Sequence, residues 1–350
     1  MSELRDVIAE YKMLGINKQI DYDKLYLYSI ITHSTAVEGS TVTEIENRLL
    51  FDEGISPDKP LKEQLMNLDL KRAYEEALLL AAEHHDYSVK LLCHLAGLVM
   101  KNTGTEYKTM VGSFSSAEGE LRLLNVTAGR GGKSYMDYKK VPKRLEDFCN
   151  WLNNQRKTVS EKDIDKIYEL SFMAHYNLVY IHPWADGNGR VSRMVMNMMQ
   201  AEFGVVPSIV KKECRDEYIK SLAKSQDIGN SEFFIGFMMQ NHLKNLKDEI
   251  YAYRKSIDDD TLKLENDTLK LGNDTLKLEN DTLNDTLNLT DKEKNVLNVI
   301  NEDNFIVIAK IMEKTGFSRP TVTRTIASLK EKKVLDRVGA KKNGHWTILK

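Results

Sequence analysis

The sequence has little cysteine and no long apolar run. Its three cysteines are odd in number, far apart and in no Cys-x-x-Cys pair, which argues against a disulfide framework and a zinc site. No apolar run approaches the ~20 residues that a membrane helix needs, and the first residues lack the charged-then-apolar pattern of a secretion signal. We therefore expect a cytoplasmic protein with buried thiols.

The sequence also has almost no net charge. Fifty Lys and Arg stand against 52 Asp and Glu, and the formal charge is −2, so the whole molecule has no electrostatic preference for nucleic acid. Hydrophobic residues at 41% and charged residues at 29% are ordinary for a globular protein. A length of 350 residues suggests two or three domains.

Helical periodicity dominates the first 255 residues. Apolar residues recur at helical spacing and predict helices over residues 23–37, 43–51, 61–84, 87–101, 141–154, 160–178, 190–203, 216–224 and 232–253. The first of these begins at Asp21 or Asp23 and ends at Gly39. Ser34 and Glu38, four residues apart, therefore share one side near its C-terminal end.

Glycine interrupts this helical pattern between residues 102 and 137. The run 121–126 is rich in leucine and valine and resembles a strand. The segment therefore predicts an irregular region that contains one hairpin.

A seven-residue repeat starts at Thr261 and recurs from Thr268, Thr275 and, in degenerate form, Thr282. Its leucines at i and i+2 would lie about 200° apart on a helix, so they form no coiled-coil seam. The pattern favours a low-complexity linker over 256–289 with short extended pieces and turns at most. A small stacked β element or an oligomerisation segment is the alternative.

The last sixty residues have a different composition. Three short helical patterns, ending with one over 319–330, precede two strand-like runs over 334–339 and 345–349. Helix-turn-helix plus a β-wing is the natural assembly over 290–350. From Asp291 onward, thirteen Lys or Arg stand against seven Asp or Glu, which fits binding to DNA or docking to a protein.

The run from Ile181 to Arg193 contains residue types that nucleotide phosphate chemistry needs. His182 can act as a general base, because imidazole titrates near neutrality. Asp186 offers a hard oxygen ligand for Mg²⁺, which proteins commonly hold by one or two carboxylates together with substrate phosphates.

The second half of this run is suited to anions. Gly187, Asn188 and Gly189 allow backbone N–H groups to converge at the positive end of the following helix. Arg190 and Arg193, three apart, lie on one helix face and can contact phosphate oxygens. These residues alone predict Mg²⁺-dependent phosphate-ester chemistry.

Residues 182–193 resemble the Fic family signature His-Pro-Phe-x-Asp/Glu-Gly-Asn-Gly-Arg-x-x-Arg, with Trp184 in place of the usual Phe. The resemblance implies transfer of AMP from ATP to a Ser, Thr or Tyr hydroxyl of a target protein. It implies His182 as general base and Asp186 as Mg²⁺ ligand. The phosphates would be held by Asn188, the glycine amides, Arg190 and Arg193. A homodimer is also expected from the resemblance.

The segment Ser34 to Gly39 resembles the family's inhibitory motif Ser/Thr-x-x-x-Glu-Gly/Asn. In that interpretation Glu38 pairs with Arg193 and denies this arginine to the γ-phosphate. Two alternatives stay open: the same site removes AMP from a modified protein, or the chain is mainly a DNA-binding regulator. A recognition helix would then present Arg319, Thr321, Thr323 and Arg324, and the wing would present Lys341 and Lys342.

The expected fold class is mainly α, a Fic-type helical bundle with a small β-hairpin flap, followed by a linker and a small α+β winged helix domain. The expected order is N-terminal helices over 1–100 with the inhibitory helix at 23–39, a catalytic core over 101–255, the linker and the winged helix. The flap is expected at about 104–137.

Overall fold

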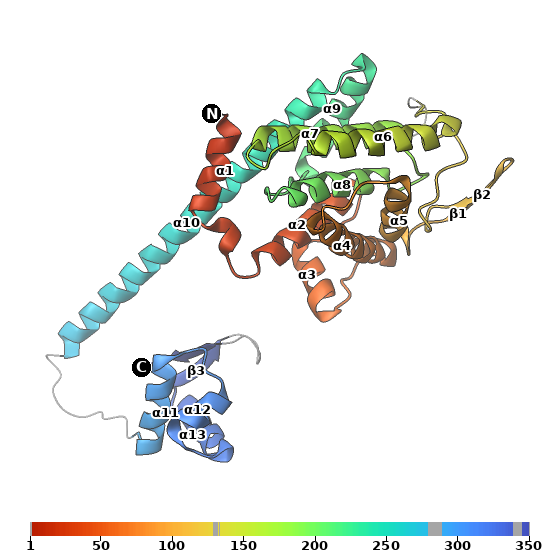
Figure 1. Ribbon diagram of the computed structural model, residues 1–350. Coiled ribbons are helices and arrows are strands. Elements are labelled where there is room, and N and C mark those ends of the chain that lie inside the picture. The colour runs from red at the N-terminus through yellow and green to blue at the C-terminus, as the bar shows by residue number, and fades with distance from the viewer. Residues whose placement is uncertain (1, 129–131, 133, 279–288, 339–344, 350) are drawn as a thin grey trace. The chain divides into compact units, whose positions relative to one another are not determined.

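The computed structural model describes residues 2–128, 132, 134–278, 289–338 and 345–349 (Figure 1). The chain divides into two compact units, Met1–Leu262 and Lys263–Lys350. Residues predicted as N-terminal helices and as catalytic core lie together in the first unit. No helix in the described part of the chain is long and apolar enough to cross a membrane.

The first unit is almost entirely helical. Its elements are α1 (Glu3–Met13), η1 (Ile16–Lys18), α2 (Tyr22–Val37), α3 (Glu44–Glu53), α4 (Leu61–Ala82), α5 (Val89–Met100), β1 (Glu106–Thr109), β2 (Gly112–Ser115), η2 (Tyr138–Lys140), α6 (Val141–Arg156), α7 (Ile164–Ile181), α8 (Asn188–Glu202), η3 (Lys212–Cys214), α9 (Arg215–Ile228) and α10 (Glu232–Leu278). The helices predicted for this unit are all present, and the mainly α fold class is confirmed. Helix α1 has no counterpart among the predicted helices.

Helix α8 lies at the centre of the first unit (Figure 1). It packs against α7 and α4 and also contacts α5 and α2. Its methionines Met194, Met196, Met198 and Met199 are buried, and these long flexible side chains fill the space between the surrounding helices. The N-terminal end of α8 is therefore held in a fixed position relative to four other helices.

The predicted strand over 121–126 is wrong. The region does contain a hairpin, but β1 and β2 form it, with the rings of Tyr107 and Phe114 stacked across the pair. The backbone around Arg122 is irregular because the buried guanidinium of this residue binds the carbonyls of His182, Leu124 and Met136. Alternating apolar residues cannot reveal such a tertiary contact.

The expectation of extended pieces in the repeat is also wrong as far as residue 278. Helix α10 continues through the repeat copies that start at Thr261 and Thr268 and into the copy that starts at Thr275, as far as Leu278. Leu, Lys and Glu are good helix formers, and a helix already nucleated in a packed segment extends at low cost. The copy that starts at Thr282 lies outside the described residues.

Beyond the end of α10, the described residues of the second unit form three helices and one antiparallel strand pair. They are α11 (Asp291–Glu302), α12 (Ile308–Thr315), α13 (Arg319–Glu331), β3 (Leu335–Val338) and β4 (His345–Ile348). A small core includes Val296, Ile311, Val322, Leu329 and Trp346. The predicted helices and strands are present in the predicted order, whereas the expected tip with Lys341 and Lys342 lies outside the described residues.

Glu293 joins the start of α11 to the C-terminal end of α13. Its carboxylate accepts bonds from Lys332 Nζ at 2.9 Å, Ser328 Oγ at 2.7 Å and the backbone N–H of Thr290 at 2.7 Å. The bond from Lys332, followed by those from Ser328 and Thr290, lowers the pKa of Glu293 to about 2. A lowered carboxylate pKa stabilises the fold above the ordinary pKa and loses this effect as the pH falls toward the lowered value.

Acidification from pH 5 to pH 2 should therefore destabilise α11 and α13 by roughly 1 kcal/mol more in the wild type than in Glu293→Gln. Hydrogen-exchange mass spectrometry of the full chain would report the protection of both helices at each pH. The matched control is Glu302→Gln, which should behave as the wild type. Glu302 is exposed, lies on α11 like Glu293 and pairs with Lys314 on α12. Equal acid sensitivity of wild type and Glu293→Gln would contradict this role.

Candidate active site

The loop between α7 and α8 begins at His182, which ends α7 in a left-handed conformation with φ of 52°. Its N–H donates to the Leu178 carbonyl at 3.0 Å, and its own carbonyl accepts from Arg122 Nε at 2.8 Å. The conformation is uncommon for a residue other than glycine and is held here from both sides. The backbone of His182 is thus fixed by a segment sixty residues earlier.

The His182 ring is largely enclosed. The Tyr135 ring stacks on it with centroids 3.6 Å apart and planes inclined by 14°. Burial, and next the positive charge of Arg122, lower the pKa of His182 to about 4. The imidazole is therefore neutral at pH 7 and able to accept a proton, as a general base must.

Trp184 anchors the middle of the loop. Its ring is buried and Nε1 donates to the Gly119 carbonyl at 3.0 Å, a bond that a Phe could not make. The Asn188 side chain closes the loop by accepting from the Trp184 N–H at 3.1 Å and donating to the Trp184 carbonyl at 2.8 Å. The Asn188 amide group is therefore used inside the loop and shapes it.

The backbone amides at the start of α8 follow this closed loop. Gly187 is the N-cap with φ of 81°, and the amides of Asn188, Gly189 and Arg190 have no acceptor within the helix because they belong to its first turn. A helix N-terminus with such amides attracts anions. This end of α8 is the predicted anion nest.

The Glu38 carboxylate already lies at this nest. A Cβ atom on Gly189 would be 2.3 Å from Glu38 Oε1, so a larger residue here would force the carboxylate to shift. Burial alone would raise the pKa of Glu38, but the charges of Arg193, Arg190 and Arg215 outweigh it and lower the pKa below its ordinary value. The chain therefore places a carboxylate of its own, with a side chain that is 37% exposed, at the predicted anion nest.

Arg193 is the partner of Glu38. Its buried guanidinium donates to Glu38 Oε1 at 2.6 Å, to Ser34 Oγ and the Ser34 carbonyl at 2.9 Å each, and to Tyr218 Oη at 3.3 Å. Arg193 and Glu38 are 155 residues apart in the sequence. The tertiary structure brings the predicted inhibitory residues and the predicted loop into direct contact.

The end of α2, the predicted inhibitory helix, is fixed by a glycine turn and by one further contact. Gly39 follows Glu38 with φ of +102°, a conformation that disfavours other residues and turns the chain away from α2. Arg215 Nε donates to the Val37 carbonyl at 2.8 Å. Arg215 therefore satisfies one of the last carbonyls of α2 and adds positive charge near Glu38.

Arg190 is buried with incomplete compensation of its charge. Nη2 contacts Met100 Sδ at 3.0 Å and lies 3.7 Å from Asp186 Oδ1, while Nη1 is 3.5 Å from the Val99 carbonyl. Nε has no acceptor among the described residues. Burial lowers the pKa of Arg190. A bound anion would supply the hydrogen-bond acceptors that its guanidinium lacks.

Asp186 is the one carboxylate in the loop. Its side chain is 56% exposed, and Oδ1 accepts from the Gly187 N–H at 2.6 Å. Among the described residues no cluster of three or more His, Cys, Asp or Glu could hold a metal by itself. Asp186 nevertheless fits Mg²⁺, which is commonly held by one or two carboxylates with substrate phosphates.

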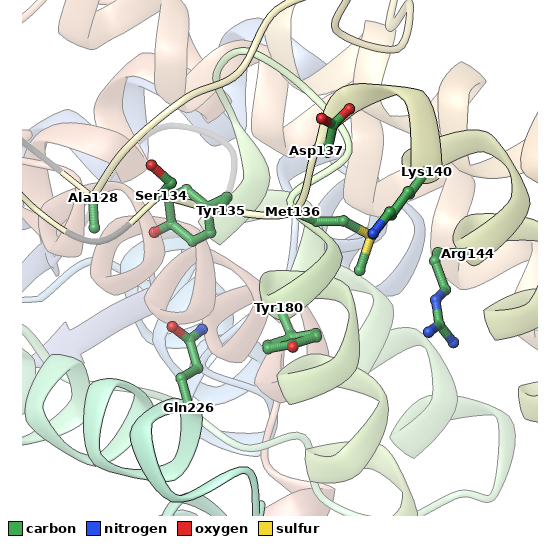
Figure 2. A pocket seen from close by; sticks show the side chains of 9 residues that line it. All are labelled: Ala128, Ser134, Tyr135, Met136, Asp137, Lys140, Arg144, Tyr180 and Gln226. Atoms are coloured by element: carbon green, nitrogen blue, oxygen red, sulfur yellow. The ribbon is translucent and has the colours of Figure 1, made fainter.

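A cavity of about 340 Å³ adjoins the stacked pair (Figure 2). Tyr135, which stacks on His182, also lines this cavity together with Lys140, Arg144, Tyr180 and Gln226. The lining comes from the segment before α6, from α6, α7 and α9. Two basic side chains and an exposed aromatic ring make it suitable for part of a polar ligand.

Four residues of this site are missed by sequence reasoning: Arg122, Tyr135, Tyr218 and Arg215. Arg122 and Tyr135 lie in an irregular segment without periodicity. Tyr218 and Arg215 lie on a helix whose pattern indicates only a packed face. No local signal identifies any of them, because their roles depend on contacts with residues far away in the sequence.

Residues 86–200 match the model of the Fic/DOC family. The chain is 28% identical over 260 residues to a protein adenylyltransferase fic-1 of Caenorhabditis elegans, with 73% of this chain and 47% of the relative covered. It is 27% identical over 233 residues to the protein adenylyltransferase Fic of Drosophila melanogaster, with 63% and 42% covered. The chain thus spans about half the length of the curated relatives it matches, or less.

Solved structures show the same fold. A Fic domain containing signaling protein from Bacteroides thetaiotaomicron aligns with a TM-score of 0.60 at 18% identity and covers 73% of this chain and 98% of that one. Fic-1 from C. elegans aligns with a TM-score of 0.54 at 23% identity and covers 71% of each chain. Residues 86–200 of this chain therefore form a Fic/DOC family domain.

Proposed function

We propose that the chain is an autoinhibited protein adenylyltransferase, which transfers AMP from ATP to a Ser, Thr or Tyr hydroxyl of a target protein. The observation that carries the proposal is the position of the Glu38 carboxylate, bonded to Arg193 and against Gly189 at the start of α8. An inhibited phosphate site needs such an internal anion. The names of the relatives support the reaction.

The reaction is a displacement at the α-phosphorus. The target hydroxyl oxygen attacks this phosphorus, the bond from the phosphorus to the oxygen bridging to the β-phosphate breaks, and pyrophosphate leaves. His182 accepts the hydroxyl proton, for which its neutral state at pH 7 is suited. Asp186 would hold Mg²⁺, which would offset the charge on the phosphates.

The first amides of α8 and the guanidinium of Arg190 would stabilise the phosphate oxygens. Both are fixed in place before ATP binds, so little reorganisation is needed in the transition state. Arg190 lacks a full set of acceptors, which a phosphate would supply.

Inhibition follows from the bonds of Arg193. Glu38 and Ser34 occupy its Nε and Nη2 groups, so the arginine is denied to the γ-phosphate. The Glu38 carboxylate also repels a phosphate that approaches the same amides. ATP would therefore bind in a non-productive position or weakly until the end of α2 moves.

Replacing Glu38 tests this inhibition. Glu38→Gly should raise incorporation of labelled AMP from ATP and Mg²⁺ into lysate proteins by about tenfold or more, since the internal anion is removed. His182→Ala in the same background should lower it by about 10²- to 10⁴-fold. Mass spectrometry of the labelled proteins would identify the modified hydroxyl.

A matched control is available at another helix end. Glu83 is the exposed C-cap residue of α4, as Glu38 is the C-cap residue of α2. Glu83→Gly removes the same side chain from an equivalent position and should leave incorporation unchanged. Equal incorporation by wild type and Glu38→Gly would refute the inhibitory role.

The lowered pKa of His182 predicts how activity depends on pH. Its pKa is lowered to about 4, and a histidine accepts a proton only when neutral, so activity should be lost as the pH falls through that value. The charge of Glu38 raises this pKa, so removing Glu38 shifts it further down. For Glu38→Gly, kcat/KM for ATP should stay constant from pH 8 to about 5, because kcat/KM reports groups of the free enzyme. An acid limb with a midpoint near pH 6.5 would argue against a buried His182.

The second unit supports a second candidate function, binding of DNA. Helix α13 exposes Arg319, Thr323 and Arg324, while Thr321 is half-buried. These side chains would contact the DNA if α13 acts as a recognition helix, and the excess of basic residues after Asp291 favours a polyanion.

Arg319→Ala/Arg324→Ala should weaken binding of the full chain to a short DNA duplex about tenfold at low salt and flatten the salt dependence. Lys292→Ala/Lys294→Ala removes equal charge from exposed positions of α11 and should have a much smaller effect. Fluorescence anisotropy at several salt concentrations would compare the two. No binding by the wild type at low salt would favour a protein-docking role.

A further inference from the structure

A buried polar network lies behind the turn that carries Glu38. Its centre is Asn67 on α4, which has no exposed surface. Its amide group makes four hydrogen bonds, which use all the bonds this group can form. Buried amides that are fully bonded specify one arrangement of the elements they join.

Two of these bonds reach the two sides of the Glu38 turn. Asn67 Oδ1 accepts from Thr35 Oγ1 at 2.8 Å, and Asn67 Nδ2 donates to Ser40 Oγ at 3.2 Å. Thr35 has a single hydroxyl proton, and 2.8 Å is the shortest of its three acceptor distances. Asn67 therefore holds a residue before Glu38 and a residue after it.

The orientation of the Asn67 amide follows from its other two bonds. Nδ2 donates to the Glu63 carbonyl at 2.8 Å, and Oδ1 accepts from Asn47 Nδ2 at 2.9 Å. A carbonyl can only accept, so the nitrogen of Asn67 must face Glu63. The oxygen then faces Thr35 and Asn47 without an alternative.

The backbone transmits this hold to Glu38. The Thr35 carbonyl accepts from the Glu38 N–H at 3.0 Å and from the Ser40 N–H at 3.1 Å. The Thr35 carbonyl thus holds the turn, and the Thr35 hydroxyl joins α2 to Asn67. Helix α4, which carries Asn67, packs on α8, which carries Arg193.

We propose that Asn67 is a positioning residue for autoinhibition: by bonding Thr35 and Ser40 it fixes the turn between them, so that the Glu38 carboxylate reaches Arg193. The inference rests on the proposed function, because it names how the inhibitory contact is set. Packing of α2 against α4 allows small shifts and rotations, whereas a directional bond on each side of the turn does not. The hydrogen bonds of the Asn67 amide reach Thr35, Asn47, Ser40 and Glu63 and no residue of the loop 182–193, so Asn67 acts through Glu38.

The test is incorporation of labelled AMP by Asn67→Ala, alone and combined with Glu38→Gly. Alone, the substitution should raise incorporation by about five- to tenfold, because the turn can leave Arg193 more often. In the Glu38→Gly background it should change incorporation less than about twofold, since the contact it positions is already absent. A loss of structure alone would not produce this dependence on Glu38.

A control and a milder variant accompany the test. Asn153 makes two hydrogen bonds to the Tyr87 backbone and touches no residue of the network. Asn153→Ala should lower the melting temperature without raising incorporation. Thr35→Val keeps nearly the same volume, removes one bond to Asn67 and should also raise incorporation. This variant provides the test if Asn67→Ala folds poorly.

The outcomes separate the two proposals. Unchanged incorporation for both Asn67→Ala and Thr35→Val, with Glu38→Gly active, would overturn the role of Asn67 and leave the proposed function standing. A rise of equal size with and without Glu38 would also overturn it, because Asn67 would then act on the site by another route. If Glu38→Gly itself equals the wild type, the proposed inhibition fails, and the role of Asn67 fails with it.

Discussion

The buried guanidinium of Arg193 is the group on which the arrangement of this protein depends. A buried positive charge is costly unless anions and acceptors surround it, and Arg193 finds them on α2, in Ser34 and Glu38. Its charge, with those of Arg190 and Arg215, lowers the pKa of Glu38 although burial opposes this. The same charge that would attract a phosphate therefore binds the end of α2 to α8.

This constraint explains why α8 lies at the centre of the first unit. The helix presents its N-terminal amides and two arginines at one end and is buried among α7, α4, α5 and α2 along its length. A rigid helix keeps these groups in place before a ligand arrives. Helix α2 ends with Glu38 at the start of α8, so a small movement of that end would change the charge there without disturbing the core.

Local patterns predict regular elements well in this chain and irregular ones poorly. The spacing of apolar residues predicts the helices of the first unit except α1, since each buries one face. The strand expected over 121–126 is wrong because Arg122 binds carbonyls from His182 and Met136, and a distant contact overrides the local preference. The repeat is helical to residue 278 because the packed part of α10 nucleates a helix that its Leu, Lys and Glu residues extend.

The sequence by itself determined the helical class, the loop with His182 and Asp186 and the two arginines, because a short run of residues contains all of these groups. It also indicated Glu38, through a motif near the end of one helix. Only the tertiary structure decided that Glu38 lies at Gly189 and pairs with Arg193, that Tyr135 stacks on His182, and that Asn67 bonds to both sides of the turn that carries Glu38. These contacts join residues far apart in the chain, and no pattern of neighbours can encode a distance that depends on how several helices pack.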